Sequence, residues 1–487
     1  MQFNSGIFVF LFLPITMAVF YILKRYAPTR IILSWLVLAS FIFYGWWNPV
    51  YLGLIAGSII VNYGLGILGQ NYKNNKPILT VAVLLNLGLL GYFKYFNFFI
   101  DNIEALSGSS YGFERIALPL AISFFTFQQI AYQVDIYRKE CAERNFMKYA
   151  LFVTFFPQLI AGPIVHHKEM MPQIETIKTN DIALHGALFS GLLFFCIGLF
   201  KKVILADALA EFANPLFDTD LAHYTPTAWE SWASILSYTG QIYFDFSGYC
   251  DMAMGLALFF GVRLPVNFAS PYKARNISEF WRTWHITLGR FLRDYLYIPL
   301  GGNRVGSIAQ MRNVIVVMLL GGLWHGASWT FVIWGGIHGA LLAIHATWSK
   351  LTLIRLPHII AVAITFFAVS FAWIFFRADT LSDAITILSS LHNFDMTRLP
   401  YFYDAPITLQ NTVQLIGLTS FHAFYWIIFG GFIIFLLPNS IQIHEKLDTS
   451  LSKTQKHYGI GALLGGLIFL MIINACKETN EFIYFNF

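Results

Sequence analysis

The chain has 487 residues, of which 57% are hydrophobic and only 12% are Asp, Glu, Lys or Arg. A soluble domain carries about 25% charged residues because its surface faces water, so this composition excludes a water-soluble protein. The net charge of +5 is spread along the chain, and no Lys/Arg run is dense enough to indicate nucleic-acid binding. The four cysteines are isolated, which argues against a disulfide framework or a zinc site.

The first apolar run, residues 7–23, is long enough to span a membrane, and no Lys or Arg precedes it. Lys24, Arg25 and Arg30 follow it, which is the reverse of the charge order in a cleavable signal peptide. We therefore expect a retained span whose N-terminus lies outside the cytoplasm.

The hydrophobic pattern predicts an all-α polytopic membrane protein with about 11 transmembrane helices of roughly 20 residues each. The predicted spans lie near residues 7–23, 31–48, 52–69, 78–99, 117–134, 183–205, 229–247, 313–334, 357–376, 421–437 and 459–475. Three shorter or interrupted apolar stretches, 149–165, 251–262 and 335–348, are interpreted as re-entrant or buried half-helices. Such segments are tolerated where protein or water satisfies their backbone groups.

The loops after the first, third and fifth predicted spans are basic, whereas the turn at 48–51 carries no charge. Because cytoplasmic loops are enriched in Lys and Arg, these three loops are expected in the cytoplasm and the turn in the periplasm. A second polar loop, 391–420, has few charges and is expected on the periplasmic side. No soluble domain or linker interrupts the chain, so we predict a single membrane-embedded domain over residues 1–487.

Residues 263–312 are too polar to span a membrane and form the most basic stretch of the chain. We expect this segment at the cytoplasmic face, partly folded into the helical bundle. Within it, Arg282, Arg290 and Arg293 are predicted to lie near one helical face, with His285 beside them. Such a face could hold a phosphate-bearing donor, because Arg pairs well with phosphate oxygens. The alternative is a basic surface helix that faces lipid headgroups.

His325 is the sharpest catalytic candidate, because ionisable residues inside apolar segments are costly. It lies in a stretch rich in Gly and Trp, residues 321–339, in which small residues allow close approach of helices or of a thin substrate. With no acidic residue nearby, a buried imidazole stays neutral, as a general base must. The alternative is a packed histidine bonded to a backbone carbonyl.

Other polar or aromatic residues of apolar segments are candidates for lining a pore. They are Asp245, Asp251, Trp324, Trp329 and His338. The alternative for His338 is helix packing or a supporting hydrogen bond. The two aspartates need cationic partners, and the arginines just downstream are expected to supply them. The amides Gln128, Gln129 and Gln133 are interpreted first as hydrogen-bonding glue between helices and second as lining of a polar tunnel.

No GxSxG elbow, P-loop, Rossmann fingerprint or HExxH motif is present, so serine hydrolase, ATPase and zinc protease chemistry lack support. The segments 281–304, LWHG at 323–326, WIFFRA at 373–378 and FIYFNF at 482–487 together resemble the membrane-bound O-acyltransferase family. The bacterial branch that O-acetylates alginate is the most similar, and FFPQLIAGPIV and YFDFSGYCDMA also fit it.

The resemblance implies a helical bundle with a central funnel, in which His325 and His285 are the motif histidines of the catalytic site. It also implies an acetyl-CoA or other acyl thioester donor, no tightly bound cofactor or metal, and a periplasmic polysaccharide acetyltransferase as partner. The expected location is the bacterial inner membrane, in contact with membrane lipid. Alginate is the first choice of polymer, and peptidoglycan or cellulose is the alternative. A polysaccharide or acyl transporter, a scaffold without catalysis, and a D-alanyl transferase remain rival hypotheses.

Overall fold

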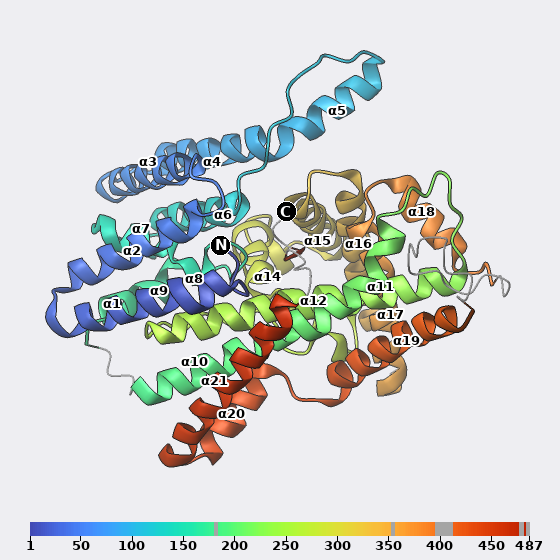
Figure 1. Ribbon diagram of the computed structural model, residues 1–487. Coiled ribbons are helices and arrows are strands. Elements are labelled where there is room, and N and C mark those ends of the chain that lie inside the picture. The colour runs from blue at the N-terminus through green and yellow to red at the C-terminus, as the bar shows by residue number, and fades with distance from the viewer. Residues whose placement is uncertain (180–183, 352–355, 395–412, 477–481, 484–487) are drawn as a thin grey trace. The chain divides into compact units, whose positions relative to one another are not determined.

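The computed structural model describes residues 1–179, 184–351, 356–394, 413–476 and 482–483 (Figure 1). Within these ranges all regular structure is helical, which confirms the all-α prediction. The chain forms two compact units, each built from segments that are distant in sequence. The first comprises Met1–Leu199, Tyr249–Val266 and His444–Asn486, and the second comprises Phe200–Gly248 and Asn267–Ile443. A single domain over 1–487 stays a prediction.

The first unit contains the N-terminal helices and the last two helices of the chain. In chain order these helices are η1 (Phe8–Phe12), α1 (Leu13–Tyr26), α2 (Thr29–Gly45), α3 (Tyr51–Asn71), α4 (Lys76–Leu90), η2 (Gly91–Tyr95), α5 (Phe96–Ser107), α6 (Ile122–Tyr137), α7 (Phe146–Thr154), α8 (Phe156–Leu159), α9 (His167–Glu175), α10 (Leu184–Phe200), α20 (Ser440–Ser450) and α21 (Lys453–Ala475). The end of α12 (Ala228–Phe259) also belongs to this unit, whereas Phe200 of α10 and the part of α20 up to Ile443 belong to the second.

Aromatic packing forms the core of the first unit. Phe3, Phe8, Phe43 and Phe156 are fully buried, and their ring centroids lie 5.1–6.2 Å apart where they contact one another. These separations suit edge-to-face and offset contacts, which stabilise aromatic pairs beyond their buried area.

Side-chain amides join the helices of the first unit where the apolar core is interrupted. Asn62 on α3 exchanges hydrogen bonds with Asn86 on α4, and Gln133 on α6 donates to the Asn62 carbonyl oxygen at 2.7 Å. Gln129 donates to Ser58 of α3 and accepts from Tyr149 of α7. For Gln129 and Gln133, hydrogen-bonding glue between helices is therefore the correct interpretation.

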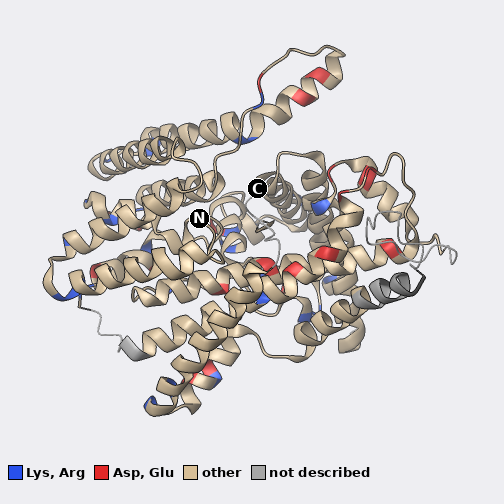
Figure 2. Cartoon of the chain, viewed as in Figure 1, with Lys and Arg blue, Asp and Glu red and all other residues tan. Residues whose placement is uncertain are grey.

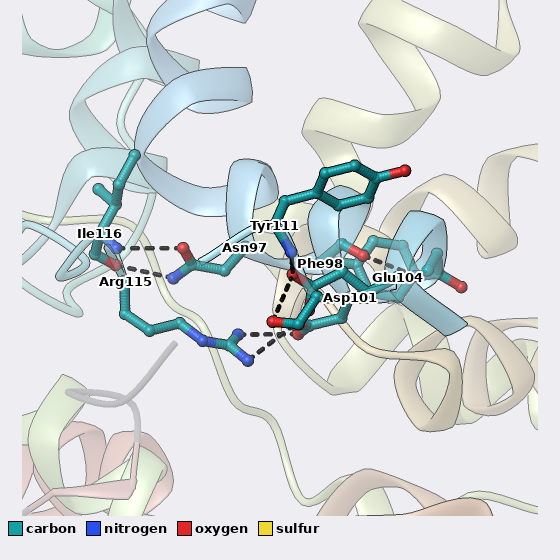
Figure 3. Close-up of polar contacts among 9 residues, drawn as sticks. Asn97, Phe98, Asp101, Glu104, Tyr111, Arg115 and Ile116 are labelled. Carbon is teal, nitrogen blue, oxygen red and sulfur yellow. Dashed lines mark hydrogen bonds and ion pairs between the residues drawn. The ribbon is translucent and has the colours of Figure 1, made fainter. Parts of the chain in front are cut away.

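The loop after α5 folds back on that helix through polar contacts (Figure 3). The Arg115 guanidinium makes a bidentate contact with Asp101, at 2.7 and 2.8 Å. Asn97 donates to the carbonyl oxygen of Ile116 and accepts from its N–H. Because the ion pair is exposed, its geometry orders the loop more than it stabilises the fold.

The second unit contains the helices of the middle of the chain and the first part of α12. The others are η3 (Lys201–Ala206), α11 (Asp207–Phe217), η4 (Pro271–Lys273), α13 (Ile277–Thr283), α14 (Ile286–Leu292), η5 (Arg293–Tyr297), η6 (Gly302–Arg304), α15 (Ser307–His325), α16 (Trp329–Leu351), α17 (His358–Arg377), α18 (Leu381–Ser390) and α19 (Val413–Leu436).

Helices α15 and α16 form a tightly packed hairpin. A Cβ atom on Gly322 would overlap the carbonyl oxygen of Phe331, and one on Gly335 would overlap that of Met318. The two backbones therefore lie closer than any larger residue would permit, as small residues allow in membrane proteins. This contact fixes the end of α15, where His325 lies.

In the described part of the chain, eight helices are long and apolar enough to cross a membrane, or nine if the bent pair Ala423–Leu436 and Ser440–Ser450 is one span. Charged residues are correspondingly sparse on the helices (Figure 2). The predicted spans 31–48, 117–134 and 229–247 correspond to α2, α6 and α12, which are too short or too polar to meet the same criteria. The chain is a multi-pass membrane protein.

Three boundary predictions need correction. The predicted span 313–334 is two helices, because α15 ends at His325 and α16 begins at Trp329. Residues 335–348 lie inside α16 and residues 251–259 inside α12, so neither stretch is an isolated half-helix. The stretch 149–165 is broken as expected, into α7, α8 and a non-helical end. Most of the polar loop 391–420 and of the ending at 482–487 lies outside the described residues.

Replacing Gly335 with alanine tests the close packing of α15 against α16. Gly335→Ala forces the hairpin apart, so the free energy of unfolding should fall by about 1–3 kcal/mol, seen as a lower Tm in detergent. Gly336→Ala is the matched control, because its Cβ would lie 3.5 Å from Leu319 Cδ2, an ordinary contact. Both changes gain the same helix propensity, so equal Tm values for the two variants would contradict the close approach.

Candidate active site

His325 is the last residue of α15 and lies in a cage of aromatic rings in the second unit. Only 2% of the residue is exposed. The ring centroids of Trp324, Trp334 and Phe376 lie 4.9, 5.1 and 5.2 Å from that of His325. The cage removes the imidazole from bulk solvent, so a hydroxyl substrate bound there would meet it without competition from water.

His285 belongs to the same cage, although it is distant from His325 in the sequence. It stands between α13 and α14 with φ of 42°, in the left-handed region that non-glycine residues rarely adopt. The residue is fully buried, and its ring centroid lies 6.3 Å from that of His325. Unusual backbone conformations of this kind cluster at functional sites, where surrounding packing holds them.

Asn267 determines which nitrogen of His285 carries the hydrogen. The Asn267 side chain meets the backbone N–H and the hydroxyl of Thr287 at 3.2 and 2.9 Å. A backbone N–H can only donate, so the atom that it meets is the amide oxygen, Oδ1. His285 Nδ1 lies 3.1 Å from the same oxygen and must donate to it. The neutral ring therefore has its hydrogen on Nδ1 and its lone pair on Nε2.

Burial lowers the pKa of His285 to about 3, because desolvation disfavours the charged ring. His285 is thus neutral across the physiological range. His285 lies outside the helices that are long and apolar enough to cross a membrane.

His338 lies on α16 beside the two motif histidines and is fully buried. Its Nδ1 accepts a hydrogen bond from the indole N–H of Trp281 at 3.2 Å. Trp334 connects it to the cage, with ring centroids 4.8 Å from His338 and 5.1 Å from His325. His338 therefore shares a wall of the cage with His325.

Trp324 and Trp329, the two tryptophans predicted to line a pore, differ in their surroundings. Trp324 is 4% exposed and contacts both motif histidines, with centroid distances of 4.9 Å to His325 and 6.1 Å to His285. Trp329, at the start of α16, is 53% exposed.

The predicted arginine face is divided. Helix α13 ends at Thr283 and α14 begins at Ile286, so Arg282 does not share a helix with Arg290 and Arg293. The expectation of one helical face was wrong, because the left-handed residue His285 interrupts the helix. Arg282 is exposed and Arg290 is half-buried. Arg293 is exposed and makes a bidentate contact with the adjacent Asp294 at 2.7 and 3.2 Å.

Asp245 is part of a buried ion-pair cluster. Lys202 of η3 lies 2.8 Å from Asp245 and 3.0 Å from Asp207, and all three side chains are at most 7% exposed. The downstream arginines were therefore the wrong partners for Asp245. Removing one member of such a buried cluster typically costs about 3–5 kcal/mol, because the remaining charge loses its partner. Asp251 belongs to the first unit, whereas the cage residues named above belong to the second.

Asn267 and Lys202 were not among the residues predicted from the sequence. Trp281 and Phe376 lie in the motif segments 281–304 and 373–378 but were not singled out there. An asparagine in a loop and an aromatic residue in an apolar run are common in any sequence, so neither marks a functional residue by itself. Lys202 had one available signal, namely a lysine inside a long apolar segment, which needs an acidic partner.

The chain is similar to known proteins over its whole length. The model of the membrane-bound O-acyltransferase family matches residues 143–379, which include both motif histidines. The peptidoglycan O-acetyltransferase of Helicobacter pylori is 42% identical over 100% of this chain and 97% of that protein. The probable alginate O-acetylase AlgI of Pseudomonas putida is 38% identical over 100% of both chains. The teichoic acid D-alanyltransferase of Bacillus subtilis is 28% identical over 53% of this chain and 68% of that protein.

The chain belongs to the membrane-bound O-acyltransferase family. It is therefore an acyltransferase, and the family resemblance seen in its motifs is confirmed. The matched region contains α13 to α17, which supply every ring of the histidine cage named above.

Replacing Asn267 with aspartate tests the protonation state of His285 in this acyltransferase. Asn267→Asp keeps an oxygen for the Nδ1–H but adds a negative charge, which raises the pKa of His285 by roughly 1–3 pH units. Acid inhibition of acyl transfer should then begin at a correspondingly higher pH, while activity at neutral pH is largely kept. The measurement is the pH dependence of kcat/KM.

Thr287→Val is the matched control, because it removes one donor from Asn267 Oδ1 without adding charge. Its acid limb should coincide with that of the wild type. An unshifted acid limb in Asn267→Asp would mean that the protonation of His285 does not govern the reaction.

Proposed function

We propose that this protein transfers an acetyl group from a thioester donor to a hydroxyl acceptor, for the O-acetylation of an extracytoplasmic polysaccharide. One observation supports this most directly: two buried histidines, His325 and His285, share an aromatic cage with a ring separation of 6.3 Å. A dry site with a neutral imidazole suits proton removal from a hydroxyl group.

In the proposed step, His325 takes the proton of the acceptor hydroxyl while that oxygen attacks the thioester carbonyl carbon. A C–O bond forms, and the C–S bond breaks as the tetrahedral intermediate collapses. The leaving thiolate then takes the proton from the His325 imidazolium. The products are an acetate ester and a thiol, and His325 is neutral again. His285, neutral with its lone pair on Nε2, supports the orientation of the reacting groups.

The donor is proposed to be acetyl-CoA or another acyl thioester that arrives from the cytoplasm. The basic segment 263–312 supports this, since its arginines could bind phosphate oxygens of the donor. Arg282 precedes His285 in the chain and Arg290 follows it, and Arg282 is exposed. The Arg293 guanidinium contacts Asp294, so we expect it to contribute less to donor binding.

The acceptor is proposed to be peptidoglycan ahead of an alginate-type exopolysaccharide. The sequence motifs alone favoured alginate, but the peptidoglycan O-acetyltransferase of H. pylori is 42% identical over the whole chain. The proposed setting is the bacterial inner membrane with a periplasmic N-terminus. A periplasmic polysaccharide acetyltransferase is the proposed partner that completes transfer to the polymer.

Replacing His325 with alanine tests the catalytic proposal. A positioned base contributes roughly 10²–10⁴-fold, so His325→Ala should abolish ester-linked acetate on the polymer while the protein level stays normal. The measurement is ester-linked acetate on separately isolated peptidoglycan and exopolysaccharide, from wild-type, deletion and His325→Ala strains. His345→Ala, farther along α16, is the matched control and should keep acetylation.

The polymer that loses acetate in the deletion strain identifies the acceptor. Normal acetate in His325→Ala with loss in the deletion strain would contradict catalysis at His325. A scaffold or transporter would then explain the deletion phenotype.

A paired substitution tests the role of the arginines. Arg282→Gln should raise the KM for the thioester donor by roughly tenfold, through loss of one charge-assisted hydrogen bond, with little change in kcat. Arg293→Gln should have a smaller effect, because that guanidinium already contacts Asp294. Donor-dependent initial rates with purified protein give both constants. Unchanged KM values in both variants would assign these arginines to lipid headgroups instead.

A further inference from the structure

Two buried N–H donors in the histidine cage have no hydrogen-bond partner among the residues that the structure describes. They are Nε1 of Trp334 and Nε2 of His338. Both residues are at most 1% exposed. Buried polar groups almost always have a partner, so an unpaired one in a native fold calls for an explanation such as a bound ligand or substrate.

The hydrogen-bond pattern fixes His338 as a donor at Nε2. The indole nitrogen of Trp281 can only donate, and it donates to His338 Nδ1. The Nδ1 atom must therefore hold a lone pair, and the neutral ring has its hydrogen on Nε2. Protonation of Nδ1 would set two hydrogens against each other, so the same contact opposes formation of the imidazolium.

The two donors lie on the same face of α16, one helical turn apart. The Trp334 ring packs between the rings of His325 and His338, at centroid distances of 5.1 and 4.8 Å. Trp334 also contacts the rings of Trp281, Trp373 and Phe376, which carry no oxygen atom. The two donors therefore lie among aromatic rings, next to the proposed base.

A second indole of the cage shows that this lack of a partner is not general. The Trp373 N–H donates to the hydroxyl oxygen of Tyr272 at 3.1 Å, and Tyr272 in turn donates to the Thr239 carbonyl oxygen at 2.8 Å. The fold thus provides an acceptor for the indole N–H of Trp373, whereas that of Trp334 has no partner in the described residues.

We propose that Trp334 Nε1–H and His338 Nε2–H form an oxyanion hole for the acyl carbonyl oxygen. This inference rests on the proposed acetyl transfer. As the acceptor oxygen bonds to the carbonyl carbon, the C=O electron pair moves onto the carbonyl oxygen, and His325 takes the acceptor's proton. The two neutral donors stabilise that negative oxygen until the C=O bond re-forms, the thiolate leaves and His325 returns the proton to sulfur. Donors that are neutral and held in place gain most in such a dry cage.

Replacing Trp334 with phenylalanine removes the N–H and keeps a packed ring. Loss of one oxyanion donor lowers kcat by roughly 10²–10³-fold in well-studied enzymes, and we expect a fall of that order for Trp334→Phe. The KM for the thioester donor should change little, because the bond strengthens only in the transition state. Purified wild type and variant are compared with acetyl-CoA as donor, a soluble oligosaccharide as acceptor, and Tm as a check on folding.

Trp373→Phe is the matched control. It removes an indole N–H of the same cage, but one that already donates a hydrogen bond to the Tyr272 hydroxyl. Its kcat should stay within a few-fold of the wild type. Equal losses of kcat in Trp334→Phe and Trp373→Phe would overturn the proposal, because ring packing would then explain both.

A second pair tests His338. In His338→Gln, the amide oxygen can accept from Trp281 while the amide N–H₂ donates, so part of kcat should be retained. In His338→Met, a side chain of similar size without a donor, kcat should fall as in Trp334→Phe. If His338→Gln is as inactive as His338→Met while both fold, the donor role of His338 is wrong.

The His325→Ala variant separates failure of this inference from failure of the proposed function. Loss of activity in His325→Ala together with normal kcat in Trp334→Phe would overturn the oxyanion hole alone. Full activity in His325→Ala would overturn only the role of His325 as the base. No acetyl transfer by the purified wild type would overturn the proposed function, and the oxyanion hole with it.

Discussion

The close approach of α15 and α16 is the constraint on which the site depends. Backbone contact at Gly322 and Gly335 leaves no room for a side chain between the helices. It places His325, at the end of one helix, against Trp334 of the other. Trp334 and His338 then fall on the same face of α16. A looser hairpin would keep the same residues but lose the contact between the imidazole and the indole.

Buried polar groups of this protein differ in whether they have a hydrogen-bond partner. In the first unit, the amides Asn62, Asn86 and Gln133 satisfy one another between helices, as the lack of water demands. In the second unit, Lys202 is held between two aspartates in the same manner. The histidine cage differs, since Trp334 and His338 each keep a buried donor with no acceptor among the described residues. Under the proposed function, these two donors are available to a substrate.

Composition and periodicity predicted the helical membrane fold because those signals are summed over many residues. His325 was singled out as an ionisable residue in an apolar run, and the structure brings it and His285 into one cage, while their catalytic roles stay a prediction. The break at His285 was missed, because a left-handed residue other than glycine has no sequence signature and the helical spacing of the arginines seemed continuous. The break in the predicted span 313–334 was also missed. Gly326, Ala327 and Ser328 were interpreted as small residues that allow close packing, whereas they form the turn between two helices.

Two histidines of the cage are held in opposite tautomers by neighbours that each have only one hydrogen-bonding role. The Asn267 amide oxygen can only accept, so His285 donates from Nδ1 and has its lone pair on Nε2. The Trp281 indole can only donate, so His338 accepts at Nδ1 and has its hydrogen on Nε2. One ring thus presents an acceptor and the other a donor, with no charge on either. Acyl transfer needs both functions around one base, and fixed neutral groups supply them without bringing charge into an apolar cage.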